Sequence, residues 1–171
     1  MPEFGDPIQL GESFIGDGVN AAHINTVLGR VGSSAEGAWI TALATPRAGF
    51  APFVTVLQPG IPVKPFTLFV NKAGVESDDH ANLTWGAAQA GVAGGVADAV
   101  AEDVIPQTEV DSLRIIVAVW VNPKADNESQ VFRNNREATR RALVAGVARH
   151  PATSDVLAAR GNPYNPFFAG A

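Results

Sequence analysis

Three histidines are the candidates for proton transfer in this sequence. His23 lies in an expected strand behind the glycine-rich turn Gly16-Asp17-Gly18. An imidazole titrates near neutral pH, so His23 could be a general acid or base, or a hydrogen-bonded structural residue. His80 stands among acidic residues in the first turn of an expected helix and is predicted to face solvent. His150 precedes Pro151 and is expected at a helix C-terminus, interacting with the helix dipole.

Lys72 is a second candidate for chemistry. Lys64 and Lys72 are the only lysines between Met1 and Pro123. Lys72 ends the expected strand Phe69-Val70-Asn71-Lys72 and could reach a site at the strand terminus. A lysine at a strand end is more often a solvated residue, so both interpretations stay open at this point.

Several other chemistries are not expected from this composition. The chain has no cysteine, which removes disulfides, thiolate zinc sites, iron–sulfur clusters and cysteine nucleophiles. The sequence has no HxH or HExxH metal-binding pattern and no GxSxG serine elbow. The segment Asp78-Asp79-His80 is interpreted as an acidic helix start rather than a metal chelate. The glycines from Gly86 to Gly95 lack the Gly-Lys-Ser/Thr ending of a phosphate loop.

The charge pattern does not favour nucleic acid or membranes. The formal net charge is −5 and the pI is about 5.1. The one basic cluster is interleaved with Glu128 and Glu137 and is interpreted as a solvated helix face. Its members are Arg133, Arg136, Arg140, Arg141 and Arg149. The N-terminus does not resemble a signal peptide, and no run of about 18 uncharged apolar residues occurs, so a cytoplasmic location is expected.

The elements that must position these residues follow from hydrophobic periodicity. Strands are expected at 8–15, 22–28, 53–57, 66–71 and 113–121, and helices at 33–45, 79–104 and 126–149. The run from Leu113 to Val121 is almost continuously apolar and β-branched, which is typical of a central strand. In the longest expected helix, Gly91, Gly94 and Gly95 each lower helix propensity by about 1 kcal/mol, so another element is expected to pack closely against them.

One domain is the expected organisation. A chain of 171 residues with 46% hydrophobic residues can bury a core, and its mixed order of strands and helices predicts an α+β fold. Residues 1–150 form the expected domain and residues 151–171 a C-terminal tail, which could dock on a neighbouring molecule through aromatic residues such as Phe167 and Phe168. Only 17% of the residues are charged, which suggests that part of the surface is buried between subunits.

Several stretches together resemble the formaldehyde-activating enzymes, which condense formaldehyde with tetrahydromethanopterin. The most specific stretch is Gly11-Glu12 followed by Gly16-Asp17-Gly18-x-x-x-x-His23-Ile24. The further matches, in the same order as in the family, are Gly32-Ser33-x-Ala35-Glu36, Gly49-Phe50, Pro62-x-Lys64-Pro65, Asn71-Lys72, Gln89-x-Gly91-Val92-Ala93, Val96-Ala97-Asp98-x-Val100-Ala101-Glu102, Ile105-Pro106 and Asn135-x-x-Ala138-Thr139. The resemblance covers Leu10 to Val147, most of the chain.

The resemblance implies a fold, an assembly and a reaction. The fold would be a compact domain like the second domain of ribosomal protein S5, assembled as a homopentamer with pterin sites between subunits. The reaction would be a lyase step of one-carbon metabolism and formaldehyde detoxification, in which formaldehyde and tetrahydromethanopterin give methylene-tetrahydromethanopterin and water without a metal. His23 would be the catalytic residue, Lys72 and Gln89 would line the pterin pocket, and Val54 falls where another pocket residue sits.

Departures from the family pattern gather in that pocket. The family has aspartate at the position of Asn25, threonine at that of Gly74 and histidine at that of Ala90. Asn25 and Gly74 would still contact the substrate, but an amide binds pterin N–H groups less strongly than a carboxylate does. These changes suggest a divergent paralogue. It could be a working enzyme, a non-catalytic carrier or sensor of pterin or formaldehyde, or an enzyme of a different condensation or lyase reaction in the same pocket.

Overall fold

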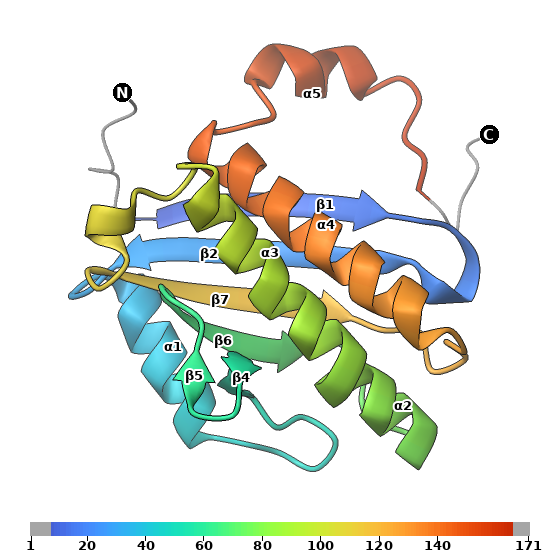
Figure 1. The fold of residues 1–171 in the computed structure, drawn as a ribbon. Helices are drawn as coiled ribbons and strands as arrows, with labels where there is room; N and C mark the ends of the chain where they lie inside the picture. Colours follow the sequence, from blue (N-terminus) through green and yellow to red (C-terminus); the bar gives the residue numbers. More distant parts are fainter. Residues whose placement is uncertain (1–7, 166–171) are drawn as a thin grey trace.

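The protein is built on a five-stranded mixed sheet. A computed structural model describes residues 8–165 of the chain (Figure 1). The strands are β1 (Ile8–Ile15), β2 (Ala22–Arg30), β3 (Phe53–Val54), β6 (Phe66–Asn71) and β7 (Leu113–Trp120). They lie in the order β1-β2-β7-β6-β3, and all neighbours are antiparallel except the parallel pair β6 and β7. The predicted α+β class is confirmed, and β7 is the central strand, as predicted.

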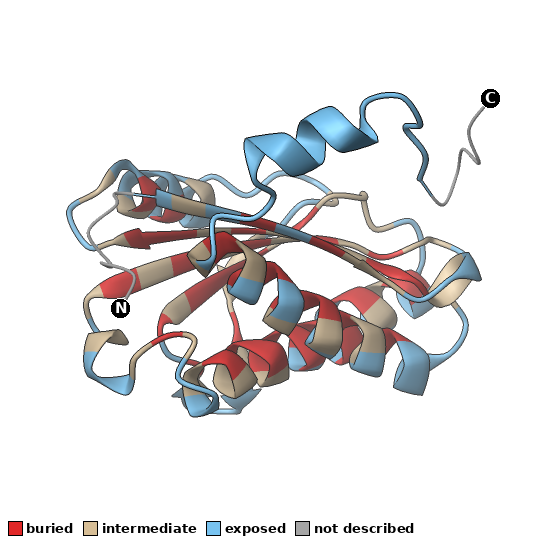
Figure 2. Ribbon diagram, turned by 90° about the horizontal axis from the view of Figure 1, so that it is seen from above, coloured by how far each residue is buried: buried red, intermediate tan, exposed pale blue. Residues whose placement is uncertain are grey.

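Helices cover the two faces of this sheet unequally (Figures 1 and 2). The helices α3 (Gln89–Ala101) and α4 (Glu128–Val147) pack together over one face, and α1 (Ser34–Ala44) packs against β2 and β7 on the other. The shorter elements are η1 (Gly18–Asn20), β4 (Val56–Gln58), β5 (Ile61–Pro62), α2 (Asp78–Asn82), the π-helical turn η2 (Leu83–Ala88), η3 (Gln107–Glu109) and α5 (Thr153–Ala159). No helix within residues 8–165 is both long and apolar enough to cross a membrane.

The main core lies between the sheet and the pair α3–α4. Side chains of a strand alternate between the two faces, so every second residue of β2 and β7 enters this core. Ile24 of β2 and Val117 of β7 are fully buried there, against Val92 and Val96 of α3. The other residues of β2, including His23 and Asn25, point to the opposite face and are half-buried.

Glycines let α3 and α4 approach each other closely, as the sequence predicted. A Cβ atom at Gly91 would lie 2.5 Å from the backbone oxygen of Phe132, and one at Gly95 would collide with the backbone oxygen of Arg136. Both backbone oxygens belong to α4. Backbone contact of this kind has no room for a side chain, which explains why a helix in this position tolerates residues of low helix propensity.

Two expected elements are arranged differently in the structure. The expected helix at 79–104 is the sequence of α2, η2 and α3, which contains a π-helical turn and ends at Ala101. The expected strand at 53–57 is divided at Thr55 into β3 and β4, because the Thr55 N–H still donates to Thr67 of β6 whereas its carbonyl accepts from Val63, which follows β5. The tail contains the helix α5, which was not expected, and none of its residues is buried. Phe167 and Phe168 lie outside the described residues.

The prediction that His80 faces solvent is wrong. Its exposed fraction is 2%. Its Nε2 lies 3.1 Å from the backbone oxygen of Val121, just past the end of β7, and its backbone N–H donates to the Ser77 hydroxyl that caps α2. The first turn of α2 therefore packs its histidine against the backbone at the end of β7. Acidic neighbours in the sequence did not reveal this contact.

Candidate functional site

A cluster of polar side chains lies on the sheet face opposite α3 and α4. The helix α1 covers this face at the end where β2 finishes with Arg30, as Figure 1 shows. The remaining part carries Leu10, Glu12, His23, Asn25 and Lys72 and is here called the open face. Leu10 is 67% exposed on it. On the open face the ionisable side chains of Glu12, His23 and Lys72 contact one another.

Lys72 reaches across a strand to the two candidate residues of β2. Its backbone N–H donates to the Val119 oxygen at 2.7 Å, which extends the pairing of β6 with β7 past Asn71. Its Nζ donates to Asn25 Oδ1 at 2.8 Å and lies 3.4 Å from His23 Nδ1. All three are site residues predicted from the sequence, and the tertiary structure brings them together.

The side chain of Lys72 crosses the intervening strand β7 to reach β2. Ala118 of β7 pairs with Asn25 on one side and with Val70 on the other. Neighbouring strands are about 4.8 Å apart, so a lysine on β6 must span about two such spacings to contact β2. Trp120 of β7 pairs with His23 on the same face, so the lysine side chain crosses β7 at the level of Ala118 and Trp120.

Glu12 completes the cluster and was missed as a functional residue. Its Oε1 lies 3.0 Å from His23 Nε2, and it stands directly opposite Asn25 in the β1–β2 hairpin. The signal was present in the sequence, since Glu12 belongs to the motif that contains His23. A two-residue period on both sides of the turn at Gly16-Asp17-Gly18 puts Glu12 and His23 on the same face. The ring of Phe14, which is paired with His23, lies 5.7 Å from the imidazole ring.

The contacts determine the protonation pattern of His23. A lysine ammonium group can only donate, so Nδ1 of a neutral imidazole accepts from Lys72 and Nε2–H donates to Glu12. Burial, followed by the charge of Lys72, lowers the pKa of His23 below its ordinary value of 6.5, and Glu12 opposes this shift. Burial also lowers the pKa of Lys72, again with Glu12 acting in the opposite direction. The cluster thus weakens the hold of both bases on a proton, which is typical of catalytic sites.

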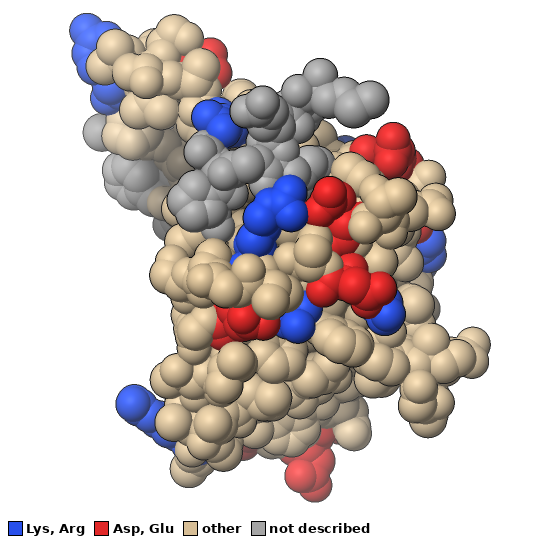
Figure 3. Space-filling view, turned by 90° about the vertical axis from the view of Figure 1, so that its left-hand side faces the viewer, with Lys and Arg blue, Asp and Glu red and all other residues tan. Residues whose placement is uncertain are grey.

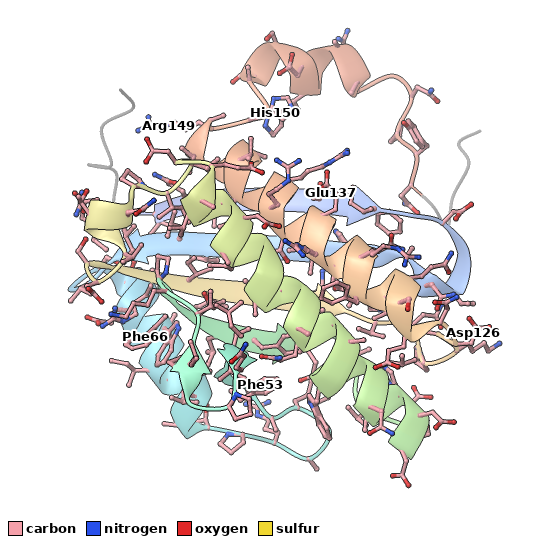
Figure 4. All side chains as sticks on the ribbon, in the orientation of Figure 1. Phe53, Phe66, Asp126, Glu137, Arg149 and His150 are labelled. Carbon is pink, nitrogen blue, oxygen red and sulfur yellow. The ribbon has the colours of Figure 1, made fainter. Side chains whose placement is uncertain are left out.

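A shallow hollow of about 360 Å³ adjoins the cluster. It is lined by Leu10, Glu12, Asn25 and Val27 of the sheet and is bordered by Pro151. The chain after α4 therefore runs along the edge of the open face. Figure 4 shows His150 between the end of α4 and α5, and its Nδ1 lies 3.7 Å from the Asp155 carboxylate.

The other three pocket residues expected from the resemblance lie apart from the cluster in this chain. Val54 is on the edge strand β3, where it pairs with Leu68. Gly74 follows Lys72 by two residues, and a Cβ there would meet the Phe50 ring at 3.4 Å. Gln89 is 8% exposed, and its Oε1 accepts the backbone N–H of Val56 at 2.7 Å, so its carboxamide holds β4 against α3.

Charged residues elsewhere form pairs of opposite sign. The basic cluster of α4 contacts acids of α3 and α4, with Arg136 bound to Asp98 at 2.7 Å and Arg140 to Glu102 at 3.0 Å. On the side shown in Figure 3, basic and acidic side chains also lie next to one another. The basic cluster is therefore a helix face whose arginines pair with acids, as expected. Among the described residues, no group of three or more acidic or histidine side chains could hold a metal ion.

Comparison with known proteins assigns the chain to a family. The sequence model described as formaldehyde-activating enzyme (Fae) matches residues 10–168. A 5,6,7,8-tetrahydromethanopterin hydro-lyase of Methanosarcina barkeri is 39% identical over 158 residues, which are 92% of this chain and 89% of that protein. Two proteins named bifunctional enzyme Fae/Hps, from Methanosphaera stadtmanae and Archaeoglobus fulgidus, are 34% and 35% identical, and the chain spans 40% of the length of each. Because the family match extends over most of its length, this chain belongs to the formaldehyde-activating enzyme family.

Proposed function

We propose that this protein is an enzyme that condenses formaldehyde with tetrahydromethanopterin to give methylene-tetrahydromethanopterin and water. Family membership and the name of the Methanosarcina barkeri relative support the reaction. The observation that supports a location for this reaction is the placement of His23 between Glu12 and Lys72 on the open face. This arrangement provides a proton donor, a carboxylate and an amine within hydrogen-bond reach of one another.

The difficult step of such a condensation is the loss of a hydroxyl group. Formaldehyde and an amine form a carbinolamine, whose hydroxyl leaves as water only after it receives a proton. His23 supplies that proton, an effect worth about 10²–10⁴-fold for a positioned general acid. The Glu12 carboxylate stabilises the imidazolium form that must precede the transfer.

The open face supports an assembly in which subunits share the site. We infer a homopentamer in which tetrahydromethanopterin lies between subunits. Val54, Gly74 and Gln89 of one subunit would then complete the pocket of His23 in a neighbour. A sheet face with Leu10 67% exposed beside half-buried ionisable groups suits such a contact. Light scattering that gave a monomer near 17.8 kDa would contradict this arrangement.

Finer features follow from the same family relationship. The fold would be that of the second domain of ribosomal protein S5, with residues 1–150 as the domain and residues 151–171 as a tail. The enzyme would act in the cytoplasm without a metal. Asn25 in the cluster donates and accepts as an amide, so it would hold the pterin with less charge assistance than an aspartate.

The test is the rate at which methylene-tetrahydromethanopterin forms from formaldehyde, after subtraction of the spontaneous rate. We expect acceleration by the purified protein and its loss in His23→Ala. His150→Ala is the control for loss of an imidazole that borders the same hollow, because the described charged contact of its Nδ1 is with the tail residue Asp155, 3.7 Å away. If the wild-type protein binds the pterin but gives no acceleration, it is a carrier or sensor instead of an enzyme.

A further inference from the structure

We propose that Lys72 is a catalytic nucleophile that captures formaldehyde covalently before the carbon passes to the pterin. The inference rests on the proposed function, because it takes formaldehyde to be the aldehyde that enters the site. It assigns to Lys72 a reaction of its own, in addition to any hydrogen bond with the second substrate.

The surroundings of Lys72 differ from those of an ordinary surface lysine. Its Nζ contacts an amide oxygen and an imidazole nitrogen, from Asn25 and His23, and neither group carries a negative charge. By contrast, the Nζ of Lys64 forms an ion pair with the Asp111 carboxylate, 2.6 Å away. Lys72 is therefore placed where it can lose its proton, as a nucleophilic amine must.

The proton that Lys72 loses has a defined acceptor. The 3.4 Å contact lets it move from Nζ to His23 Nδ1. The product is a neutral amine beside an imidazolium whose Nε2–H is paired with Glu12, 3.0 Å away. Asn25 still accepts one N–H of the neutral amine and so directs the nitrogen lone pair. One proton transfer thus produces the nucleophile and the general acid together.

Capture of formaldehyde proceeds in two balanced steps. The Lys72 lone pair forms a C–N bond, the π electrons of the carbonyl move to oxygen, and the proton displaced from nitrogen goes to that oxygen. This gives a carbinolamine on Lys72. The nitrogen lone pair then expels the hydroxyl, which takes a proton from His23 and leaves as water. An iminium ion remains on Lys72, and His23 is neutral.

Transfer of the carbon restores the starting state. A pterin nitrogen attacks the iminium carbon and gives its proton to His23, which passes it to the Lys72 nitrogen. The C–N bond to Lys72 breaks, the free amine is released, and the carbon becomes an iminium on the pterin. The second pterin nitrogen closes the methylene bridge and returns one proton to His23. The sum is formaldehyde plus two N–H groups giving a CH₂ bridge and water.

The test is reductive trapping of the iminium in the absence of pterin. The full-length protein is treated near neutral pH with a low concentration of ¹³C-formaldehyde and cyanoborohydride, which converts each iminium to an N-methyl group. Peptide mass spectrometry then measures methylation at each of the three lysines, Lys64, Lys72 and Lys124. We expect labelling of Lys72 to exceed that of the other two by at least about tenfold, because a positioned acid typically contributes 10²–10⁴-fold.

Two variants make the test specific. His23→Gln removes the acid and should reduce labelling of Lys72 about tenfold or more while Lys64 is unchanged. Lys72→Arg keeps a positive donor toward Asn25 but cannot form an iminium, so it should bind the pterin and lose turnover. Labelling of Lys72 at or below that of Lys64, or full turnover by Lys72→Arg, would overturn the inference. Because trapping needs no pterin, its result is independent of whether the condensation itself is detected.

Discussion

The two faces of the central sheet serve different purposes. On the face under α3 and α4, residues such as Val117 and Val96 are fully buried and backbones meet at Gly91. On the open face, His23 and Lys72 are only half-buried and their pKa values are lowered. One face of the sheet thus stabilises the fold while the other holds the reactive side chains, because alternate residues of a strand have independent surroundings. Substitutions on the two faces should therefore have separable effects.

The largest effect is expected for His23→Gln. The rate of condensation should fall by about 10²–10⁴-fold. The free energy of unfolding should change by no more than about 0.5 kcal/mol, since the side chain is half exposed and lies outside the core. Steady-state kinetics together with urea unfolding measure both quantities. A large loss of stability would mean that the two faces are not independent.

The helix-covered face should give the opposite result with Gly91→Val. The new side chain would meet the Phe132 carbonyl of α4, and overpacking of this kind costs about 1–3 kcal/mol. Thermal unfolding measures the loss, and kcat of the fraction that remains folded should be unchanged. Gly86→Ala is the matched control in the same helical segment. Nothing lies within 4 Å of a Cβ at Gly86, so this variant should gain about 0.5–1 kcal/mol.

Asn25→Asp tests whether Lys72 of the open face acts in covalent capture or only in binding. A carboxylate in place of the Asn25 amide, whose oxygen is 2.8 Å from Nζ, would raise the pKa of Lys72, because an opposite charge favours the protonated amine. Trapping of formaldehyde on Lys72 at neutral pH should therefore decrease about tenfold or more, while the affinity for tetrahydromethanopterin increases through charge-assisted hydrogen bonds. Opposite changes in trapping, which decreases, and in pterin affinity, which increases as a lower KM, are the expected signature. Parallel changes would show that Lys72 acts only in binding.

The smallest effect is in the titration of His23. In the free protein its pKa should lie below 6.5 because of burial and the Lys72 charge. Lys72→Met should raise this pKa and Glu12→Gln should lower it further, as measured by NMR of the imidazole. Lys64→Met should leave it unchanged. Since the folded state binds this proton less firmly than the unfolded chain, stability should decline as the pH falls from 6.5 through the folded pKa. A pKa above 6.5 would contradict the described electrostatics.

Local patterns predicted much of the fold. The strands at 8–15 and 66–71 have the bounds that alternation and turn residues indicated. The glycines of α3 correctly predicted a close neighbour, because a helix with low propensity must gain its stability from packing. Periodicity failed at His80, which is buried by a contact with Val121 far away in the chain. Periodicity also did not predict α5, because that segment is rich in turn residues and the helix start depends on a single side-chain contact, from the Ala152 N–H to the Asp155 carboxylate.

The sequence by itself determined most strands of the central sheet, the long helices, the candidates His23 and Lys72, and the family, because these depend on residue type and on spacing along the chain. Only the tertiary structure decided that these two residues belong to one site. They are 49 positions apart, and they meet because β7 pairs with β2 on one side and with β6 on the other and so holds both strands in register. The lateral order of strands depends on long-range pairing, which no local period encodes. That order places His23, Lys72 and Glu12 in one cluster whose side chains contact one another.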